Sequence, residues 1–238
     1  MNDSAPDPDQ PARRDQFEGE GAIRGTARME AFADGVFAIA FTLPIVEIAI
    51  PEVAGDGAVL GDELRLLGPA YGGYILASVV IGLYWVQHHF SGAIFRTTGH
   101  WFVIATTAFL AAIGFIAFPA RVLAEHFPDV AARPAAARYW VVALAGVSVA
   151  WLIKWTVGIH RTHIDARLET RYVSRLTRQY QLVALANVGA AGIVFWNWQA
   201  GLLTSALLML WLVFPPETPR YTTEAPIIEG EVAPSPPQ

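Results

Sequence analysis

The fold of this chain is decided by residues 28–50, R-M-E-A-F-A-D-G-V-F-A-I-A-F-T-L-P-I-V-E-I-A-I. The stretch begins with charge and then stays apolar long enough to cross a bilayer, because about 20 residues at about 1.5 Å rise each span the hydrocarbon core. A plain membrane anchor does not need its polar residues, which include Asp34, Thr42 and Glu47. We therefore interpret it as a helix that lines a pore, with the rest of the chain forming a wall around it.

The composition is that of a membrane protein. Of the 238 residues, 54% are hydrophobic and 16% are charged, whereas soluble domains usually carry about 25% charged residues. The sequence contains no cysteine, which excludes disulfides, thiolate metal sites and cysteine nucleophiles. No basic tract with interleaved aromatic residues occurs, so we expect no nucleic-acid partner.

Six apolar segments predict an all-α integral membrane protein with six transmembrane helices. They lie at about residues 31–50, 66–88, 101–123, 138–159, 179–198 and 201–214. A strongly basic segment, 160–178, separates the fourth span from the fifth. The polar segments 1–23 and 215–238, the second rich in Pro and Glu, are predicted to be disordered cytoplasmic tails around a six-helix transmembrane domain at 24–214.

The positive charges predict the orientation of these spans. With six spans, all but four of the 16 Lys and Arg residues fall on one side of the membrane. The four on the other side are Arg65, Arg121, Arg133 and Arg138. Because cytoplasmic loops carry the excess of Lys and Arg, both termini are predicted to be cytoplasmic, in a multi-pass protein of the plasma membrane.

One side of the first predicted helix forms a continuous seam. Its members are four or three residues apart, as one helix face requires: Gly35, Ile39, Thr42, Val46 and Ala49. The seam is narrow and mostly apolar, with one hydroxyl near the middle of the membrane. Two interpretations stay open at this point, a face that lines a pore and a packing seam inside the subunit.

Asp34 lies just inside the apolar run, where a carboxylate is costly unless it is paired or hydrated. Candidate partners at the same depth are Arg28, folding back along the helix, and the two histidines His88 and His89 at the inner end of the second span. A structural polar clamp between helices and a proton relay both fit this pattern, and we favour the clamp.

Two pairs of histidines are candidate metal ligands. His88 and His89 are adjacent, so on a helix they point in different directions. His160 and His163, with Asp165, have a better spacing, but they lie in a basic segment that disfavours a cation. We therefore predict no metal site.

Catalytic and filter motifs are missing from the sequence. It has no P-loop, no Gly-x-Ser-x-Gly and no His-Glu-x-x-His. The Gly-Gly-Tyr at 72–74 lies inside a predicted span rather than in the re-entrant loop that a carbonyl-lined filter needs. We predict no enzymatic activity, no cofactor and no re-entrant pore loop.

Two motifs resemble a known family. Residues 28–43, with Arg28, Phe32 and Asp34 in the pattern R-x-x-x-F-A-D-G-V-F-A-I-A-x-T-L, resemble the first-helix signature of the bacterial homologues of transmembrane protein 175, the lysosomal potassium channel. The sequence Y-W-V-x-H-H at 84–89 is similar to the end of the second helix in that family. The resemblance covers about residues 24–214.

The resemblance implies a function and a set of pore residues. Bacterial members are potassium channels that carry one six-helix unit per chain and assemble as homotetramers, with the four first helices lining the pore. By this likeness Ile39 forms a hydrophobic constriction, Thr42 a hydroxyl ring and Val46 a second apolar ring, and Leu43 is grouped with them. The expected activity is passive conduction that favours K⁺ over Na⁺, with the lipid bilayer and potassium ions as the other partners.

The same likeness implies a packing network that supports the pore helix. It comprises Arg28, Phe32 and Asp34 of the first helix with His88 and His89 of the second. The usual serine before the aspartate is Ala33 here, which removes one hydrogen bond from the network.

Pro44 replaces the large aliphatic residue expected in the family. It frees the carbonyl of Ala40 and is expected to bend the outer half of the helix. Acidic residues follow in a predicted loop near the outer mouth, where they would concentrate cations: Glu47, Glu52, Asp56, Asp62 and Glu63.

Other function classes compete with the channel. A proton-permeable channel and a secondary transporter remain open, although the midplane polar residues are few and no internal repeat is visible. A membrane enzyme is disfavoured, because no acid/base pair or nucleophile constellation is evident. Without the family likeness, a structural membrane protein would be the first interpretation.

Overall fold

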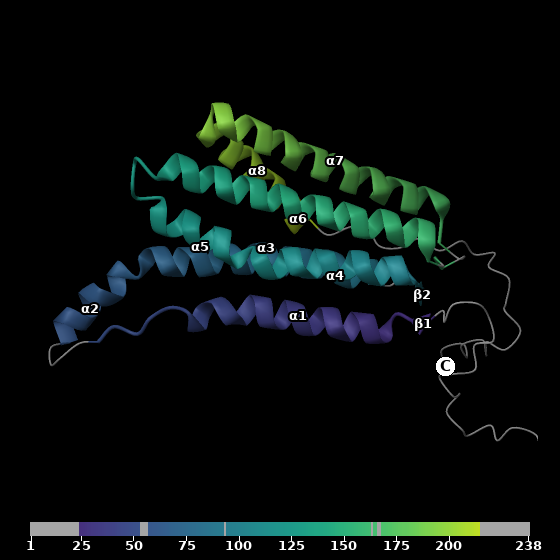
Figure 1. Cartoon of the computed structure of the whole chain (residues 1–238), viewed down its shortest axis with the longest axis horizontal. Helices are drawn as coiled ribbons and strands as arrows, with labels where there is room; N and C mark the ends of the chain where they lie inside the picture. Colours follow the sequence, from purple (N-terminus) through teal and green to yellow (C-terminus); the bar gives the residue numbers. More distant parts are fainter. Residues whose placement is uncertain (1–23, 53–56, 93, 163, 166–167, 215–238) are drawn as a thin grey trace, which may run out of the picture.

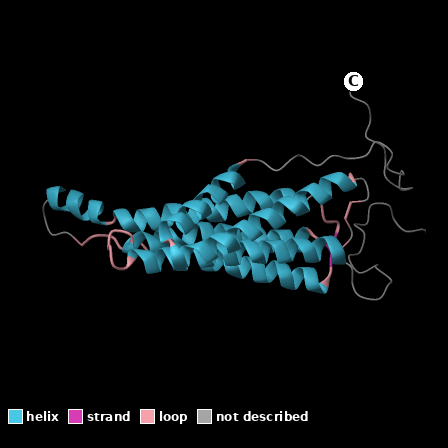
Figure 2. Ribbon diagram, turned by 90° about the horizontal axis from the view of Figure 1, so that it is seen from above, coloured by secondary structure: helices cyan, strands magenta, loops and turns pink. Residues whose placement is uncertain are grey.

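The structure is an elongated bundle of helices laid side by side (Figures 1 and 2). The computed structural model describes residues 24–52, 57–92, 94–162, 164–165 and 168–214. Its elements are β1 (Arg24–Gly25), α1 (Ala27–Val46), α2 (Gly57–Leu66), α3 (Gly68–Gly92), β2 (Thr97–Thr98), α4 (His100–Phe115), α5 (Ala117–His126), α6 (Arg133–Arg161), α7 (Thr170–Trp196) and α8 (Trp198–Val213). The two tails predicted to be disordered lie outside the described residues.

The prediction of an all-α membrane protein is confirmed by these helices. Within the described residues, four helical stretches are long and apolar enough to cross a membrane: Ala27–Val46, Gly68–Gly92, His100–His126 and Arg133–Arg161. The helix α8 is apolar but shorter, with 16 residues. The count of six spans stays a prediction, because α7 begins with three arginines and α8 falls short of the usual length.

The first predicted span is shifted toward the N-terminus. The helix α1 begins at Ala27 and ends at Val46, so Ile50 lies beyond it. Pro44 stands in the last turn, where its missing N–H leaves the Ala40 carbonyl without the usual partner and weakens the helix end. The expected bend is therefore replaced by a helix end, and the chain leaves α1 two residues after Pro44.

A second proline explains why the third predicted span is divided. The helix α4 ends at Phe115 and α5 begins at Ala117, with Ile116 still in a helical conformation (φ −62°, ψ −25°). Pro119 has no N–H to donate to the carbonyl of Phe115, so the helical ladder of hydrogen bonds is interrupted there.

Two segments predicted as links are partly helical. The acidic loop after α1 contains α2, which extends past the end of the bundle (Figure 1). The basic segment 160–178 was expected to separate two spans, yet α6 runs to Arg161 and α7 begins at Thr170. Arginine is a good helix former, so charge alone did not mark the helix boundary.

The helix α6 is the centre of the bundle, packed against α4, α5, α7 and α8. Aromatic rings fill the core around it, with Trp151 5.1 Å from Phe109 and Tyr180 5.0 Å from Trp155, measured between ring centroids. The helix α1 packs mainly on α3 and α4 and forms the edge of the bundle opposite α7 (Figure 1). The pore-helix candidate is thus the least covered of the four candidate spans.

Short pairings join the connections at the end of the bundle where α1 begins. Arg24 and Gly25 of β1 pair antiparallel with Thr98 and Thr97 of β2. Further along, an ion pair joins Arg96 to the buried Asp165. The start of α1 is therefore attached to the α3–α4 connection before it enters the bundle.

The corner between α7 and α8 depends on a glycine. Asn197 ends α7, and its side-chain oxygen accepts a hydrogen bond from the backbone N–H of Ala200 at 2.9 Å, which caps α8. A Cβ at Gly201 would lie 2.6 Å from the Cα of Val194, closer than real Cβ contacts allow. Only a residue without a side chain lets α8 fold back this tightly on α7.

Gly201→Ala is expected to lower the free energy of unfolding by about 1–3 kcal/mol, because the new methyl group must displace the backbone of α7. The matched control is Gly192→Ala, since a Cβ at Gly192 meets nothing within 4 Å. Thermal unfolding of the purified chain in detergent would test this. Equal midpoints for the two variants would contradict the prediction.

Candidate pore helix and its polar contacts

The two sides of α1 have opposite environments. Ala33, Phe37 and Ala40 are buried against α3 and α4. On the opposite side, Ile39 and Val46 are 61% and 73% exposed. The predicted seam therefore does not pack inside the described part of the subunit, although most residues on each side of α1 are apolar.

Each predicted pore residue lies on the uncovered part of α1. Ile39, Thr42, Leu43 and Val46 are all exposed in the single chain. The hydroxyl of Thr42 donates to the carbonyl oxygen of Ala38 at 2.8 Å, so it is satisfied without a partner from another helix. Its oxygen keeps lone pairs that can face a cation.

Asp34 receives a partner that the sequence did not indicate. The indole Nε1 of Trp85 donates to Asp34 Oδ1 at 3.1 Å. The Trp85 ring in turn stacks on His89, with ring centroids 5.5 Å apart and 27° between the ring planes. This contact attaches the inner half of α1 to α3, which fits a structural clamp.

The remaining residues of the predicted network do not gather at this contact. Arg28 is exposed, and Phe32 is 57% exposed. Arg28, Phe32, Gly35 and Ile39 follow one another at helical spacing along the uncovered side of α1. Within one chain the structure joins Asp34 to His89 through Trp85, and places Arg28 and Phe32 away from them.

His88 points into the core instead of joining its neighbour at the surface. Its Nδ1 lies 2.7 Å from Nζ of Lys154, and its ring lies 5.6 Å from that of Phe37. Lys154 is buried, with its ammonium 4.3 Å from the centroid of Trp151 and 3.5 Å from the hydroxyl of Ser91. A polar pair between α3 and α6 thus sits behind the buried face of α1.

Sequence reasoning missed Lys154 as a partner and counted it only as a cytoplasmic charge. One signal was available. Lys154 is the only lysine in the chain and lies within an otherwise apolar predicted span. An ionisable side chain at such a place is expected to face the bundle interior and to have a polar partner.

A polar cavity of about 590 Å³ opens at the N-terminal end of α1. It lies between the first turns of α1 and the last turns of α3, and its polar lining comes from Thr26, Glu30, Asp34, His88, His89 and Arg96. Over the part of the chain that the structure describes, no group of three His, Asp or Glu side chains could hold a metal ion. His163, one of the residues weighed for a metal site, lies outside the described residues.

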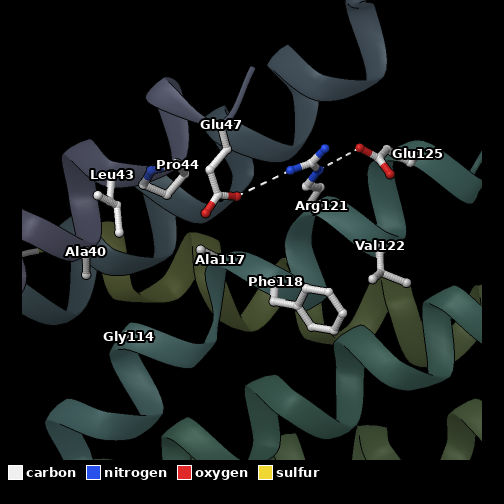
Figure 3. A pocket seen from close by; sticks show the side chains of 10 residues that line it. All are labelled: Ala40, Leu43, Pro44, Glu47, Gly114, Ala117, Phe118, Arg121, Val122 and Glu125. Carbon is white, nitrogen blue, oxygen red and sulfur yellow. Dashed lines mark hydrogen bonds and ion pairs between the residues drawn. The ribbon is translucent and has the colours of Figure 1, made fainter. Parts of the chain in front are cut away.

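A second cavity, of about 370 Å³, separates the C-terminal end of α1 from α5 (Figure 3). Arg121 of α5 reaches across to Glu47, with Nη1 3.3 Å from Oε2, and its Nε donates to Glu125 at 2.7 Å. A Cβ at Gly73 would lie 3.0 Å from the Cα of Arg121, so α3 holds the backbone of α5 closely here. The ion pair between Glu47 and Arg121 therefore connects the end of α1 to α5 at the place where the cavity interrupts apolar packing.

The acidic residues predicted near the outer mouth have different environments. Glu47 pairs with Arg121, and Asp62 pairs with Arg65 at 2.8 Å. Glu52 and Glu63 are exposed. Asp56 lies outside the described residues. Part of the negative charge expected at the mouth is thus neutralised locally.

Comparison with known proteins identifies the family. A family model described as "Endosomal/lysosomal potassium channel TMEM175" matches residues 28–117. A potassium channel of Chamaesiphon minutus is 33% identical over 160 residues, which are 66% of this chain and 77% of that protein. This chain belongs to the TMEM175 family. The family resemblance that the sequence indicated is confirmed, and the family is one of ion channels rather than enzymes.

Two further TMEM175 relatives extend the likeness over most of the chain. A potassium channel of Streptomyces collinus is 29% identical over 202 residues, covering 84% of this chain and 97% of the relative. The crystal structure of a lysosomal potassium-selective channel TMEM175 homolog from Chamaesiphon minutus matches with a TM-score of 0.65 and 26% identity, over 79% of this chain and 96% of the other. The helical bundle is therefore the TMEM175 fold.

Proposed function

We propose that this chain forms a potassium-selective cation channel and conducts passively through a pore lined by α1. The observation that carries the proposal is the uncovered face of α1, where Ile39, Thr42 and Val46 follow one another on a membrane-spanning helix. This face is mostly apolar, and its one hydroxyl already donates a hydrogen bond within its own helix. Such a face suits an ion path better than a substrate site. The potassium channels among its relatives support the choice of ion.

The proposed assembly is a homotetramer in which each subunit spans the plasma membrane six times. Four copies of α1 around an axis would cover the exposed faces that one chain leaves open, and α7 and α8 would complete the six spans. The excess of Lys and Arg on the side where α1 begins supports cytoplasmic termini. A Val46→Cys variant offers a test, because the native chain has no cysteine and oxidation would join facing copies.

Selectivity would arise where the path is narrowest and least polar. A ring of isoleucines at Ile39 offers no oxygen ligand, so a cation that passes it must shed part of its water. Potassium loses water at a lower cost than sodium, which favours its passage. A Thr42 ring lies one turn further out and would supply oxygen atoms beside the constriction.

Asp34 and Trp85 would set the rotation of α1 about its own axis. Their hydrogen bond fixes the inner half of α1 to α3, and the buried stripe Ala33, Phe37 and Ala40 fixes the side that faces α4. With both in place, Ile39 can face only away from the subunit. The clamp is therefore a support for the pore and carries no proton in this proposal.

Ion substitution in planar bilayers tests the proposed function. Purified protein is reconstituted, and reversal potentials are measured with K⁺ on one side and Na⁺ on the other, then with a proton gradient at constant K⁺. Single-channel currents with a reversal potential near that of K⁺ are expected. Saturable, proton-coupled flux without channel openings would indicate a transporter, and a reversal potential that follows the proton gradient would indicate a proton channel.

The ion pair between Glu47 and Arg121 at the end of α1 leads to a separate prediction. Glu47→Gln and Arg121→Gln are both expected to change open probability in the same direction, by up to about fivefold, because an exposed ion pair contributes up to about 1 kcal/mol. Glu125→Gln is the matched control, since it removes only the pair within α5. Single-channel recording measures the effect. If Glu47→Gln and Arg121→Gln act in opposite directions, the two charges influence cations at the mouth and do not tether α1.

A further inference from the structure

Three arginines form a stripe on the uncovered side of α7. Arg171, Arg175 and Arg178 are four and three residues apart, and all three are exposed. On a helix this spacing places them on one face. The residues that α7 buries, among them Tyr172 and Leu176, alternate with them and face α6.

The same face of α7 continues as an apolar surface. Leu182 and Leu185 follow at the same spacing and are 61% and 71% exposed. The helix lies on the outer edge of the bundle, opposite α1 (Figure 1). A single uncovered face thus changes from arginine to leucine between Arg178 and Leu182, over about 6 Å of helix.

This change marks the boundary between headgroups and acyl chains. Leucines so exposed on a membrane protein contact lipid tails. Arg178 lies about 6 Å from Leu182 along the helix and Arg171 about 16 Å, and long arginine side chains extend along the surface, so both guanidinium groups can reach the layer of lipid headgroups. The side is the one predicted to be cytoplasmic. The face therefore matches a phospholipid in the order of its polarity, with arginines for the headgroup and leucines for an acyl chain.

Two arginines of α7, Arg171 and Arg178, differ from the arginines at the other end of the bundle. Arg65 and Arg121 pair with acidic side chains there. Arg171 and Arg178 form no ion pair with any residue that the structure describes. Asp165, an acidic residue before α7, is bound to Arg96. The positive charge of Arg171 and Arg178 is left for a partner outside the chain.

We propose that this face of α7 binds an anionic phospholipid of the cytoplasmic leaflet. The headgroup phosphate contacts the guanidinium groups of Arg171 and Arg178, and an acyl chain lies along Leu182 and Leu185. The planar guanidinium donates two parallel hydrogen bonds to phosphate oxygens, which an ammonium cannot reproduce. The site lies on the opposite edge of the bundle from α1, so the proposal does not depend on ion conduction.

Lipid titration of the full-length chain tests the charge contribution. Binding of phosphatidylglycerol and phosphatidylcholine to the detergent-solubilised protein is followed by native mass spectrometry. The variant Arg171→Gln/Arg178→Gln is expected to bind phosphatidylglycerol about thirtyfold more weakly, because each arginine near a membrane surface contributes about 1 kcal/mol. Arg65→Gln, which removes one positive charge at the other end of the bundle, is expected to bind like wild type.

Three results would overturn the proposal. They are equal affinity for the two lipids, equal losses in the α7 and Arg65 variants, and displacement of phosphatidylglycerol by millimolar inorganic phosphate, which would mean a site for free anions. The variant Arg171→Lys/Arg178→Lys keeps the charge and is the control for misfolding of the glutamine variant. It is expected to retain the preference for the anionic lipid with reduced affinity.

A fluorescence experiment tests the apolar half of the site. Because the chain contains no cysteine, Leu185→Cys provides a single position for a fluorescent label. In bilayers whose phosphatidylglycerol carries brominated acyl chains, the label is expected to be quenched relative to the same protein in unbrominated lipid. Fluorescence that does not respond to bromine would mean that another protein surface covers this face, and would overturn the assignment to lipid.

Discussion

Ile39→Asn is expected to bring the potassium-to-sodium permeability ratio close to 1 and to raise the single-channel conductance. In the proposed pore Ile39 stands on the uncovered face of α1 with no polar group of its own. An asparagine there presents an amide oxygen and an amide N–H, so an ion and its water can pass without full dehydration. The difference between K⁺ and Na⁺ in the free-energy cost of dehydration at the Ile39 constriction would disappear.

The size of this effect follows from one hydrogen bond. A polar ligand that replaces lost water contributes about 1–2 kcal/mol, which corresponds to roughly a fivefold to thirtyfold change in the permeability ratio. The matched control is Ile45→Asn, the same substitution on a different side of α1. Reversal potentials under mixed K⁺ and Na⁺ measure both variants. If Ile39→Asn behaves like wild type or like Ile45→Asn, Ile39 is not the constriction.

Lys154→Ala is expected to lower the free energy of unfolding by about 3–5 kcal/mol. The substitution removes the partner of His88 Nδ1 and leaves a cavity between the rings of Trp151 and Phe109. Loss of one member of a buried polar pair and loss of core volume each destabilise, and at this site they occur together. Denaturant titration in mixed micelles would measure the change.

Lys154→Met is the control for that experiment. Methionine keeps most of the side-chain volume and an apolar contact with Trp151, and loses the hydrogen bonds of the ammonium to His88 and Ser91, so a cost of about 1–2 kcal/mol is expected. The ordering of the three proteins is the diagnostic result. Equal stability of Lys154→Ala and wild type would show that the pair between α3 and α6 contributes nothing to the fold.

The helices themselves were largely predictable from the chain. A bilayer core offers no water to backbone N–H and C=O groups, so an apolar stretch of about 20 residues has to be helical. Prolines also had local consequences that could have been derived, since Pro44 precedes the end of α1 and Pro119 explains the break after Phe115. Charged segments were misleading in two places, since α2 lies within the predicted acidic loop and α7 begins at Thr170, inside the predicted basic link.

The contacts between helices were not predictable in the same way. Candidate partners for Asp34 were chosen by depth in the membrane, and the structure selects Trp85, which lies one turn from His89. Depth in the membrane restricts the partners of Asp34 to side chains at the same level of the bundle. Rotation of α3 about its axis then decides which side chain at that level points toward α1.

The sequence by itself determined the class of this protein, its apolar helices and its membership of the TMEM175 family, because these depend on composition, length and short motifs. Tertiary structure decided which face of α1 stays uncovered, that His88 turns inward to Lys154 while His89 stays with Trp85, and that Glu47 pairs with Arg121. The physical reason is that the few polar residues of α1 are spread around it and mark no polar face. A helix without a polar face carries no local signal of its orientation, so packing against α3 and α4 decides which side stays uncovered.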